Sequence, residues 1–336
     1  MNSPHDFASD NVAGAMPEVM EALARFNGGF AASYGDDEVC AQAGDLIRDL
    51  LDTDAEVHFV ASGTAANALS LAALAQPHES VLAHEHSHVA TDETGAPGFF
   101  GAGMGVVGLP GTSGRIDPAA LALALDRPDD PHRQSPAALS LTNATEYGAL
   151  YAESDLATLI APTKVRGLKV HLDGARLANA VAAGFDPKAV ARLGVNVMVL
   201  GGTKAGSTPT EAIVLFDNAL GRRFGARLKH AGQLISKSRF LAAPWIGMLE
   251  TSAWATRAGH ANAMAARLAA LMPFKVVHPV EANAVFVAMD DAVLTRLAET
   301  GLTVGRVLDG SARFMCSWAT TLEAVDTLGA ALKTVA

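Results

Sequence analysis

Apolar residues along this chain follow two alternating patterns, short β-branched runs and longer stretches with helical spacing. Runs typical of buried strands lie at 58–61, the start of 80–93, 103–111, 138–148, 167–173, 195–200 and 210–216. Helical spacing recurs at 16–26, 38–51, 64–75, 117–125 and 155–162. Because strands that alternate with helices form βαβ units, residues 57–217 predict an α/β fold with a mostly parallel mixed sheet.

The pattern changes in the last third of the chain. A basic amphipathic helix is predicted at 220–233, followed by a long helical region through Leu271. Beyond it, the short strands FKVVH, NAVFVAM and SARFMCSW alternate with helices at 291–299 and 321–333. We therefore expect a large domain at 15–245 and a small α+β domain at 246–336, which the N-terminal segment 1–14 joins.

Composition and charge narrow the class of protein. The 336 residues are 50% hydrophobic and 18% charged, which is typical of a folded globular chain. A net charge of −10 without a basic cluster argues against a nucleic-acid partner. The first residues have no signal-peptide pattern, and no apolar run is long enough for a membrane span, so a cytoplasmic enzyme is expected. Cys40 and Cys316 lie far apart and are expected to be reduced thiols.

An acid and a lysine follow two of the predicted strands. Asp173 ends the run GLKVHLD, and Lys204 follows VNVMVL inside the small-residue loop GGTKAGS. Ligands of open α/β sheets bind where strands end in loops. Pyridoxal phosphate (PLP) needs a Schiff-base lysine and an acid beside its pyridinium nitrogen, so this pair predicts a PLP site. The alternatives are a surface lysine at Lys204 and a structural salt bridge between Asp173 and Arg176.

Three further features permit two interpretations each. Gly63 and Thr64 lie in a strand–turn–helix segment that suits a phosphate, although an ordinary capped turn has the same sequence. His84, His86 and His88 would share one face of a strand, so zinc is the alternative to an imidazole stacked on a cofactor. No further ligands accompany them, so no metal is predicted. Arg313 could bind a substrate carboxylate, and the alternative is an ordinary surface arginine.

In this order, the motifs SDN, YGDDE, SGTAAN, HVATDE-GAP, HLDGARLANA, GGTKAG and RFMCSW resemble the low-specificity L-threonine aldolases. The resemblance covers nearly the whole chain, and HLDGAR with GGTKAG is its most specific part. It implies the aspartate-aminotransferase fold of PLP enzymes (fold type I), in the group of β-eliminating lyases. It also implies a homodimer or homotetramer.

The resemblance also assigns roles to cofactor residues. Lys204 would hold PLP, and Asp173 would pair with the pyridine nitrogen. His88, which precedes Glu93 in the family pattern H-x4-E, would stack on the ring. Gly63 and Thr64 would hold the phosphate.

Substrate residues follow from the same comparison. Arg313, with Ser9 and with Arg176 beside the cofactor, would orient the amino-acid carboxylate. Tyr34 would reach the site of a neighbouring subunit. Thr145 stands where many family members have a histidine near the substrate hydroxyl, and Ala8 stands where many have an arginine. Because threonine cannot act as a base near neutral pH, His88 is the best candidate for the base, either directly or through a water.

The implied reaction cleaves L-threonine, L-allo-threonine and other β-hydroxy-α-amino acids, such as phenylserine, to glycine and an aldehyde. Two other functions remain open at this point. One is a different fold-type-I PLP enzyme, a β-eliminating lyase or an aminotransferase. The other is a metalloprotein that uses the histidine cluster.

Overall fold

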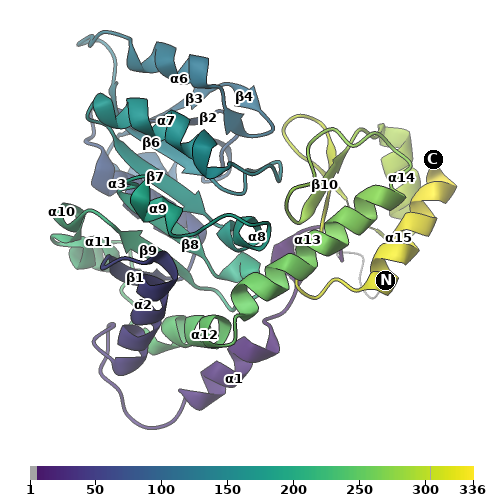
Figure 1. Cartoon of the computed structure of the whole chain (residues 1–336), viewed down its shortest axis with the longest axis horizontal. Helices are drawn as coiled ribbons and strands as arrows, with labels where there is room; N and C mark the ends of the chain where they lie inside the picture. The colour runs from purple at the N-terminus through teal and green to yellow at the C-terminus, as the bar shows by residue number, and fades with distance from the viewer. Residues whose placement is uncertain (1–5, 303) are drawn as a thin grey trace.

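A seven-stranded mixed sheet forms the centre of the larger part of the molecule (Figure 1). The computed structural model describes residues 6–302 and 304–336. The sheet has the order β1-β9-β8-β7-β6-β2-β3, and only β9 runs against its neighbours. Its strands are β1 (Glu56–Val60), β2 (Glu79–His84), β3 (Gly105–Leu109), β6 (Ser135–Thr142), β7 (Lys169–Gly174), β8 (Val197–Gly201) and β9 (Glu211–Leu215). The predicted α/β class and mostly parallel sheet are confirmed.

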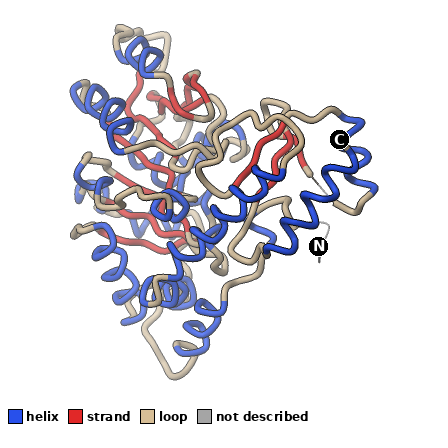
Figure 2. Tube along the Cα trace, turned by 45° about the vertical axis from the view of Figure 1, so that its right-hand side comes forward, coloured by secondary structure: helices blue, strands red, loops and turns tan. Residues whose placement is uncertain are grey.

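Helices cover both faces of this sheet, as Figure 2 shows. Residues of β8 alternate between two apolar cores, with Met198 and Leu200 in one and Val197 and Val199 in the other. This alternation follows from the two-residue period of a strand. The helices of this part are α1 (Pro17–Arg25), α2 (Glu38–Leu51), α3 (Gly63–Leu74), α4 (His88–Thr91), α5 (Ala96–Phe100), α6 (Pro118–Leu125), α7 (Glu153–Val165), α8 (Leu177–Ala182), α9 (Ala189–Arg192), α10 (Asn218–Gly221), α11 (Phe224–His230) and α12 (Arg239–Glu250).

The smaller part is built on a three-stranded antiparallel sheet of order β10-β12-β11. The long helix α13 leads into it from α12 (Figure 1). Phe7, from the N-terminal segment, belongs to its apolar core together with Phe314 and Leu328. The elements are α13 (Ala253–Leu271), β10 (Ala284–Val287), α14 (Asp291–Glu299), β11 (Gly305–Arg306), β12 (Ala312–Met315) and α15 (Leu322–Val335). Shorter elements elsewhere are the 3-10 helices η1 (Asp10–Val12) and η2 (Thr203–Ala205) and the hairpin of β4 (Gly111–Thr112) and β5 (Arg115–Ile116).

The domain boundary predicted between residues 245 and 246 falls within α12, and it stays a prediction. Of the predicted segment 1–14, residues 1–5 lie outside the described part. No helix in the described ranges combines the length and the apolar character that a membrane span needs.

Four predicted elements differ in detail. The helix expected at 220–233 is split into α10 and α11 because Arg223 adopts a left-handed conformation, with φ of 63°. The long helical region is interrupted in the same way at Ser252, with φ of 59°. The segment FKVVH contributes one isolated bridge, at Val276, rather than a strand. β2 ends at His84, so the three histidines do not share a strand face.

Candidate active site

Lys204 lies immediately after β8, a strand in which every residue is buried. The lysine loop packs closely on its neighbours. A Cβ at Gly202 would lie 2.6 Å from the Thr210 carbonyl oxygen, and one at Gly201 would overlap the Ala175 carbonyl. The two glycines therefore let the loop lie against the adjacent chain, and Lys204 lines a cavity of about 480 Å³.

Asp173 is buried at the carboxyl end of β7, next to the strand that leads to the lysine. Its Oδ1 accepts a hydrogen bond from the Ala175 N–H (2.9 Å), and its Oδ2 accepts one from Asn67 Nδ2 (2.8 Å). Burial alone would raise the pKa of Asp173, but His171, Lys204 and the two hydrogen bonds together hold it below its usual value. Asp173 therefore remains ionised in the folded protein and suits a pyridinium partner.

His88 belongs to the same hydrogen-bonded chain as Asp173. Glu93 Oε1 lies 2.8 Å from His88 Nδ1 and accepts a hydrogen bond from Asn67 Nδ2 (2.9 Å). The hydrogen bond to Glu93 raises the pKa of His88 against the opposing effect of burial. Since the carboxylate accepts the Nδ1 proton, the neutral His88 ring keeps the lone pair of Nε2 for the cavity that it lines.

The predicted phosphate turn forms the N-terminus of α3. Ser62 is the N-cap, and its side chain accepts a hydrogen bond from the Ala65 N–H. The N–H groups of Gly63 and Thr64 have no acceptor among the described residues. Apart from its chain neighbours and the backbone of its own helix, no described atom lies within 4 Å of a Cβ built on Gly63, so the space in front of the turn is open. Free N–H groups at the positive end of a helix suit a phosphate.

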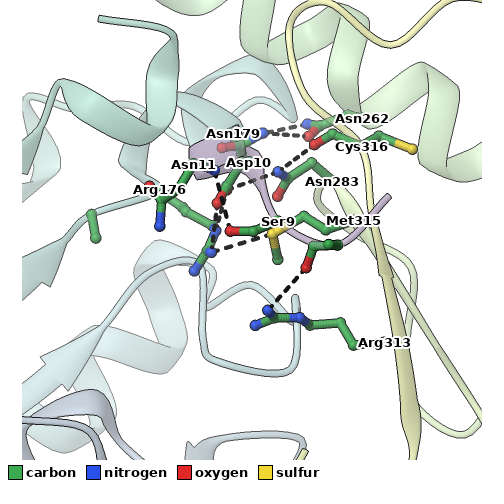
Figure 3. Close-up of polar contacts among 12 residues, drawn as sticks. Ser9, Asp10, Asn11, Arg176, Asn179, Asn262, Asn283, Arg313, Met315 and Cys316 are labelled. Carbon is green, nitrogen blue, oxygen red and sulfur yellow. Dashed lines mark hydrogen bonds and ion pairs between the residues drawn. The ribbon is translucent and has the colours of Figure 1, made fainter. Parts of the chain in front are cut away.

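Arg176 is buried and pairs with Asp10 rather than with Asp173 (Figure 3). The guanidinium donates from Nε (2.7 Å) and from an Nη (3.0 Å) to the two oxygens of Asp10. Asn283 Nδ2 donates to the same carboxylate (3.1 Å). The alternative of an Asp173–Arg176 salt bridge is therefore wrong. Asp10 fixes the orientation of Arg176, which also lines the cavity.

Arg313 lies beside this pair, on β12, and lines the same cavity as Ser9. Its guanidinium donates to the backbone carbonyl of Ala8, at 3.3 Å. Figure 3 marks this contact by the dashed line from Arg313. Burial, and repulsion from Arg176, lower the pKa of Arg313. A carboxylate placed between the two guanidinium groups would relieve that repulsion, so the arrangement suits an anionic substrate group.

Two predicted substrate residues lie outside the lining of this cavity. Thr145 is buried, and its hydroxyl donates to the Ser113 carbonyl (2.7 Å) and accepts from the Ala149 N–H (3.1 Å). Tyr34 lines a separate cavity of about 580 Å³ next to α2 and β1, with Lys229 Nζ 4.6 Å from its ring centre.

The histidine cluster is spread over a turn. His84 ends β2, His86 follows in the turn, and His88 begins α4. In the described part of the chain, no group of three His, Cys, Asp or Glu side chains is arranged to hold a metal ion. Of the three, His86 and His88 line the active-site cavity.

Sequence reasoning assigned no function to five residues of the site. Asp10, Asn67 and Glu93 lie inside the motifs SDN, SGTAAN and H-x4-E, so the motifs themselves were the signal. His86 and Tyr147 line the cavity, and Tyr147 Oη lies 2.6 Å from His86 Nδ1. That contact joins residues 61 positions apart, and no local pattern indicates it.

The chemistry of these side chains fits PLP. The site offers a lysine, an ionised acid on the neighbouring strand, free N–H groups at a helix N-terminus and a cavity. The buried hydroxyl of Ser207, in the lysine loop, also has no hydrogen-bond partner among the residues described. A phosphorylated aromatic aldehyde with a pyridine nitrogen can use each of these groups.

Comparison with known proteins supports this interpretation. The family model of the β-eliminating lyases matches residues 6–292. The low specificity L-threonine aldolase of Pseudomonas aeruginosa is 43% identical, over 98% of this chain and 97% of that protein. The enzyme of the same name from Pseudomonas sp. (strain NCIMB 10558) is 41% identical, over 98% of this chain and 97% of its own length.

Solved structures of similar fold support the same family. The threonine aldolase of Leishmania major superposes with a TM-score of 0.92 at 30% identity, covering 98% of this chain and 99% of that one. A structure of SPT with PLP shares the fold at a TM-score of 0.70 and 18% identity, covering 100% and 90%. The predicted fold type I is confirmed. This chain belongs to the PLP-dependent β-eliminating lyase family, in its low-specificity L-threonine aldolase group.

Proposed function

We propose that this protein cleaves L-threonine, L-allo-threonine and other β-hydroxy-α-amino acids, such as phenylserine, to glycine and an aldehyde. One observation carries the proposal. Lys204 and Asp173 lie at the ends of adjacent strands, and the cavity that Lys204 lines also contains a pair of arginines suited to a carboxylate. Threonine aldolases that align over nearly the whole chain support the same reaction.

The cofactor residues are assigned by their chemistry. Lys204 would hold PLP through its amino group, and Asp173 would keep the pyridine nitrogen protonated. The N–H groups of Gly63 and Thr64 would bind the phosphate, and His88 would lie on the ring. When bound, PLP supplies the electron sink for the α-carbon of an amino acid.

Arg313, with Ser9 and Arg176, would bind the substrate carboxylate. Fixing the carboxylate orients the amino acid so that one bond of its α-carbon breaks selectively, which is how positioning lowers the barrier. Because Asp10 already holds two donors of Arg176, Arg313 has more free donors to offer. We assign Arg313 the larger share of carboxylate binding.

His88 is the base in this proposal. His88 lines the cavity and Glu93 holds its Nδ1, so its free Nε2 can accept the proton of the substrate β-hydroxyl. Loss of that proton lets the oxygen form the aldehyde carbonyl as the bond between the α- and β-carbons breaks. The buried hydroxyl of Thr145 is already hydrogen-bonded on both sides, so we assign it no proton transfer.

We also propose that the protein works as a homodimer that pairs into a homotetramer in the cytoplasm. Phe30 and Tyr34 are exposed on the loop between α1 and α2, which fits contact with a second subunit. Both cysteines are buried and free, which suits a reducing compartment. Light scattering on the purified protein should give twice or four times the 34.6 kDa of one chain, and a fully active monomer would contradict this.

Product analysis tests the reaction. The purified protein with PLP should release equal amounts of glycine and acetaldehyde from L-threonine, and of glycine and benzaldehyde from phenylserine. Pyruvate and ammonia from serine would instead indicate a β-eliminating lyase, and a keto acid would indicate an aminotransferase. Either product without glycine would overturn the proposal.

A further inference from the structure

The active-site cavity contains a second imidazole, that of His86. Glu146 and Tyr147 line the cavity from the loop after β6, and His86 lines it from the turn after β2. Within the loop after β6, Thr145 takes the place of a histidine and turns its hydroxyl to the Ser113 carbonyl. The loop therefore presents a phenol to the cavity, and the neighbouring turn presents the imidazole.

The Tyr147 hydroxyl determines which nitrogen of His86 carries the proton. His86 Nδ1 lies 2.6 Å from the Tyr147 hydroxyl oxygen. Burial raises the pKa of Tyr147 to about 12, so the phenol keeps its proton near neutral pH. A buried O–H without an acceptor is costly, so this proton goes to His86 Nδ1. Neutral His86 then carries its own proton on Nε2.

The phenol is held in place by the small domain. The ring of His278 packs on that of Tyr147, with centroids 4.3 Å apart. His278 Nε2 lies 2.6 Å from the Asp309 carboxylate, and its Nδ1 lies 3.0 Å from the Ser113 hydroxyl. Tyr147 itself is only 4% exposed. These contacts leave the hydroxyl little freedom to turn away from His86.

The neutral rings of His86 and His88 are therefore opposite tautomers. His88 Nδ1 faces a carboxylate, so its neutral ring presents a lone pair at Nε2. His86 Nδ1 faces a phenol, so its neutral ring presents an N–H at Nε2. Nε2 of neither ring has a hydrogen-bond partner among the described residues. Two titratable groups whose surroundings differ in this way are suited to different roles in one reaction.

We propose that His86 is a second catalytic residue that donates a hydrogen bond from Nε2 to the β-oxygen of the substrate while His88 removes the proton of that oxygen. Tyr147 is the positioning residue that fixes the tautomer of His86. The inference rests on the proposed aldol cleavage and names the group that faces its developing negative charge.

The step balances without a further reactant. The β-hydroxyl proton moves to Nε2 of His88, and an oxygen electron pair becomes the second carbon–oxygen bond of the aldehyde. The electron pair of the broken bond stays with the glycine α-carbon. The N–H of His86 is not transferred, and it stabilises the charge on the oxygen as the donors of an oxyanion hole do.

The first test removes the imidazole. His86→Asn in the holoenzyme should lower kcat for threonine cleavage by about 10²–10³-fold, the usual cost of losing one oxyanion donor, while KM changes little. His132→Asn, at an exposed histidine, is the matched control and should behave as wild type. A wild-type kcat in His86→Asn would overturn the proposal. If His86→Asn does not bind PLP, the Tyr147→Phe variant described next tests the proposal.

The second test removes one oxygen. Tyr147→Phe should lower kcat by about tenfold, because the imidazole remains but its tautomer is no longer fixed. Tyr151→Phe removes an equally buried hydroxyl that accepts from the Ile116 N–H outside the cavity, and it should not lower kcat. If Tyr147→Phe keeps the wild-type kcat, the proposal is wrong.

A spectroscopic readout separates this inference from the proposed reaction. Nitrogen-15 NMR of histidine-labelled holoenzyme, compared with His86→Asn to assign the signal, should show His86 protonated at Nε2. Tyr147→Phe should convert the signal to a mixture of tautomers. An Nδ1-protonated His86 in wild type would overturn the inference even with an active enzyme. Absence of glycine formation by wild type would instead reject the proposed reaction, whatever the tautomer.

Discussion

The active site has two walls that are built differently. The cofactor wall consists of Asp173, at the carboxyl end of β7, and Lys204, just after β8, and both strands are central in one sheet. The substrate wall consists of turns and of residues from the small domain, with Arg313 on β12 and Tyr147 supported by His278. In the proposed assignment, the cofactor lies at the ends of buried strands, whereas the substrate lies where turns and the small domain meet. Changes in substrate preference are therefore expected in the second wall.

Removing the lysine is the most severe way to break the cofactor wall. Lys204→Ala should lose the visible absorbance of lysine-bound PLP and reduce cleavage by about four orders of magnitude or more. Lys237→Ala, in the segment before α12, is the control and should keep both signals. A lysine-bound PLP spectrum in Lys204→Ala would reject the assignment of Lys204.

Removing the base tests the substrate side without disturbing the lysine. His88→Asn should reduce kcat by about 10²–10⁴-fold, the usual contribution of positioned acid–base catalysis. The PLP absorbance of the variant shows whether the cofactor is still bound. A variant that binds PLP and cleaves at the wild-type rate would show that another group takes the hydroxyl proton.

The Asp10–Arg176 pair joins the N-terminal segment to the turn between β7 and α8. Asp10→Asn leaves a buried guanidinium without its counter-charge, which should reduce the free energy of unfolding by about 3–5 kcal/mol. KM should also rise because Arg176 loses its fixed orientation. Denaturant unfolding measures the first effect. Asp326→Asn, in the exposed pair with Arg267, is the control and should change stability little. Equal losses of stability in Asp10→Asn and Asp326→Asn would show that the buried pair contributes no more than the exposed one.

The smallest expected effect is a shift in pH dependence. The hydrogen bond that His88 donates to Glu93 raises the pKa of His88, and a base must be unprotonated to act. Glu93→Gln should therefore lower the pKa of His88 and move the acidic limb of kcat/KM to lower pH. Glu85→Gln, at an exposed neighbour, should leave the limb in place. A limb that stays or moves to higher pH in Glu93→Gln would show that this hydrogen bond does not set the pKa.

The two walls also differ in how far the sequence predicts them. Strand periodicity placed Asp173 and Lys204 at strand ends, since burial determines each strand locally. The pairing of Asp10 with Arg176 spans 166 positions and has no periodic signal. Periodicity also suggested that His84, His86 and His88 share one strand face. The chain instead turns after His84, whose Nδ1 accepts a hydrogen bond from the His86 N–H at 3.0 Å.

Family resemblance filled part of that gap, and one residue that it named, Thr145, lies outside the lining of the cavity. It drew attention to Thr145, where a histidine was expected, but the hydroxyl of Thr145 turns inward to the Ser113 carbonyl. The side chains that line the cavity in its place, Tyr147 and His86, become visible only when two loops and the small domain are assembled. Such contacts depend on tertiary packing, which no local pattern specifies.

A crystal structure of the protein with PLP and glycine tests the two-wall arrangement most directly. The account predicts PLP next to Lys204, its pyridine nitrogen at Asp173, its phosphate at Gly63 and Thr64, and the glycine carboxylate at Arg313. A pyridine nitrogen away from Asp173, or a carboxylate bound elsewhere than at the arginines, would contradict it.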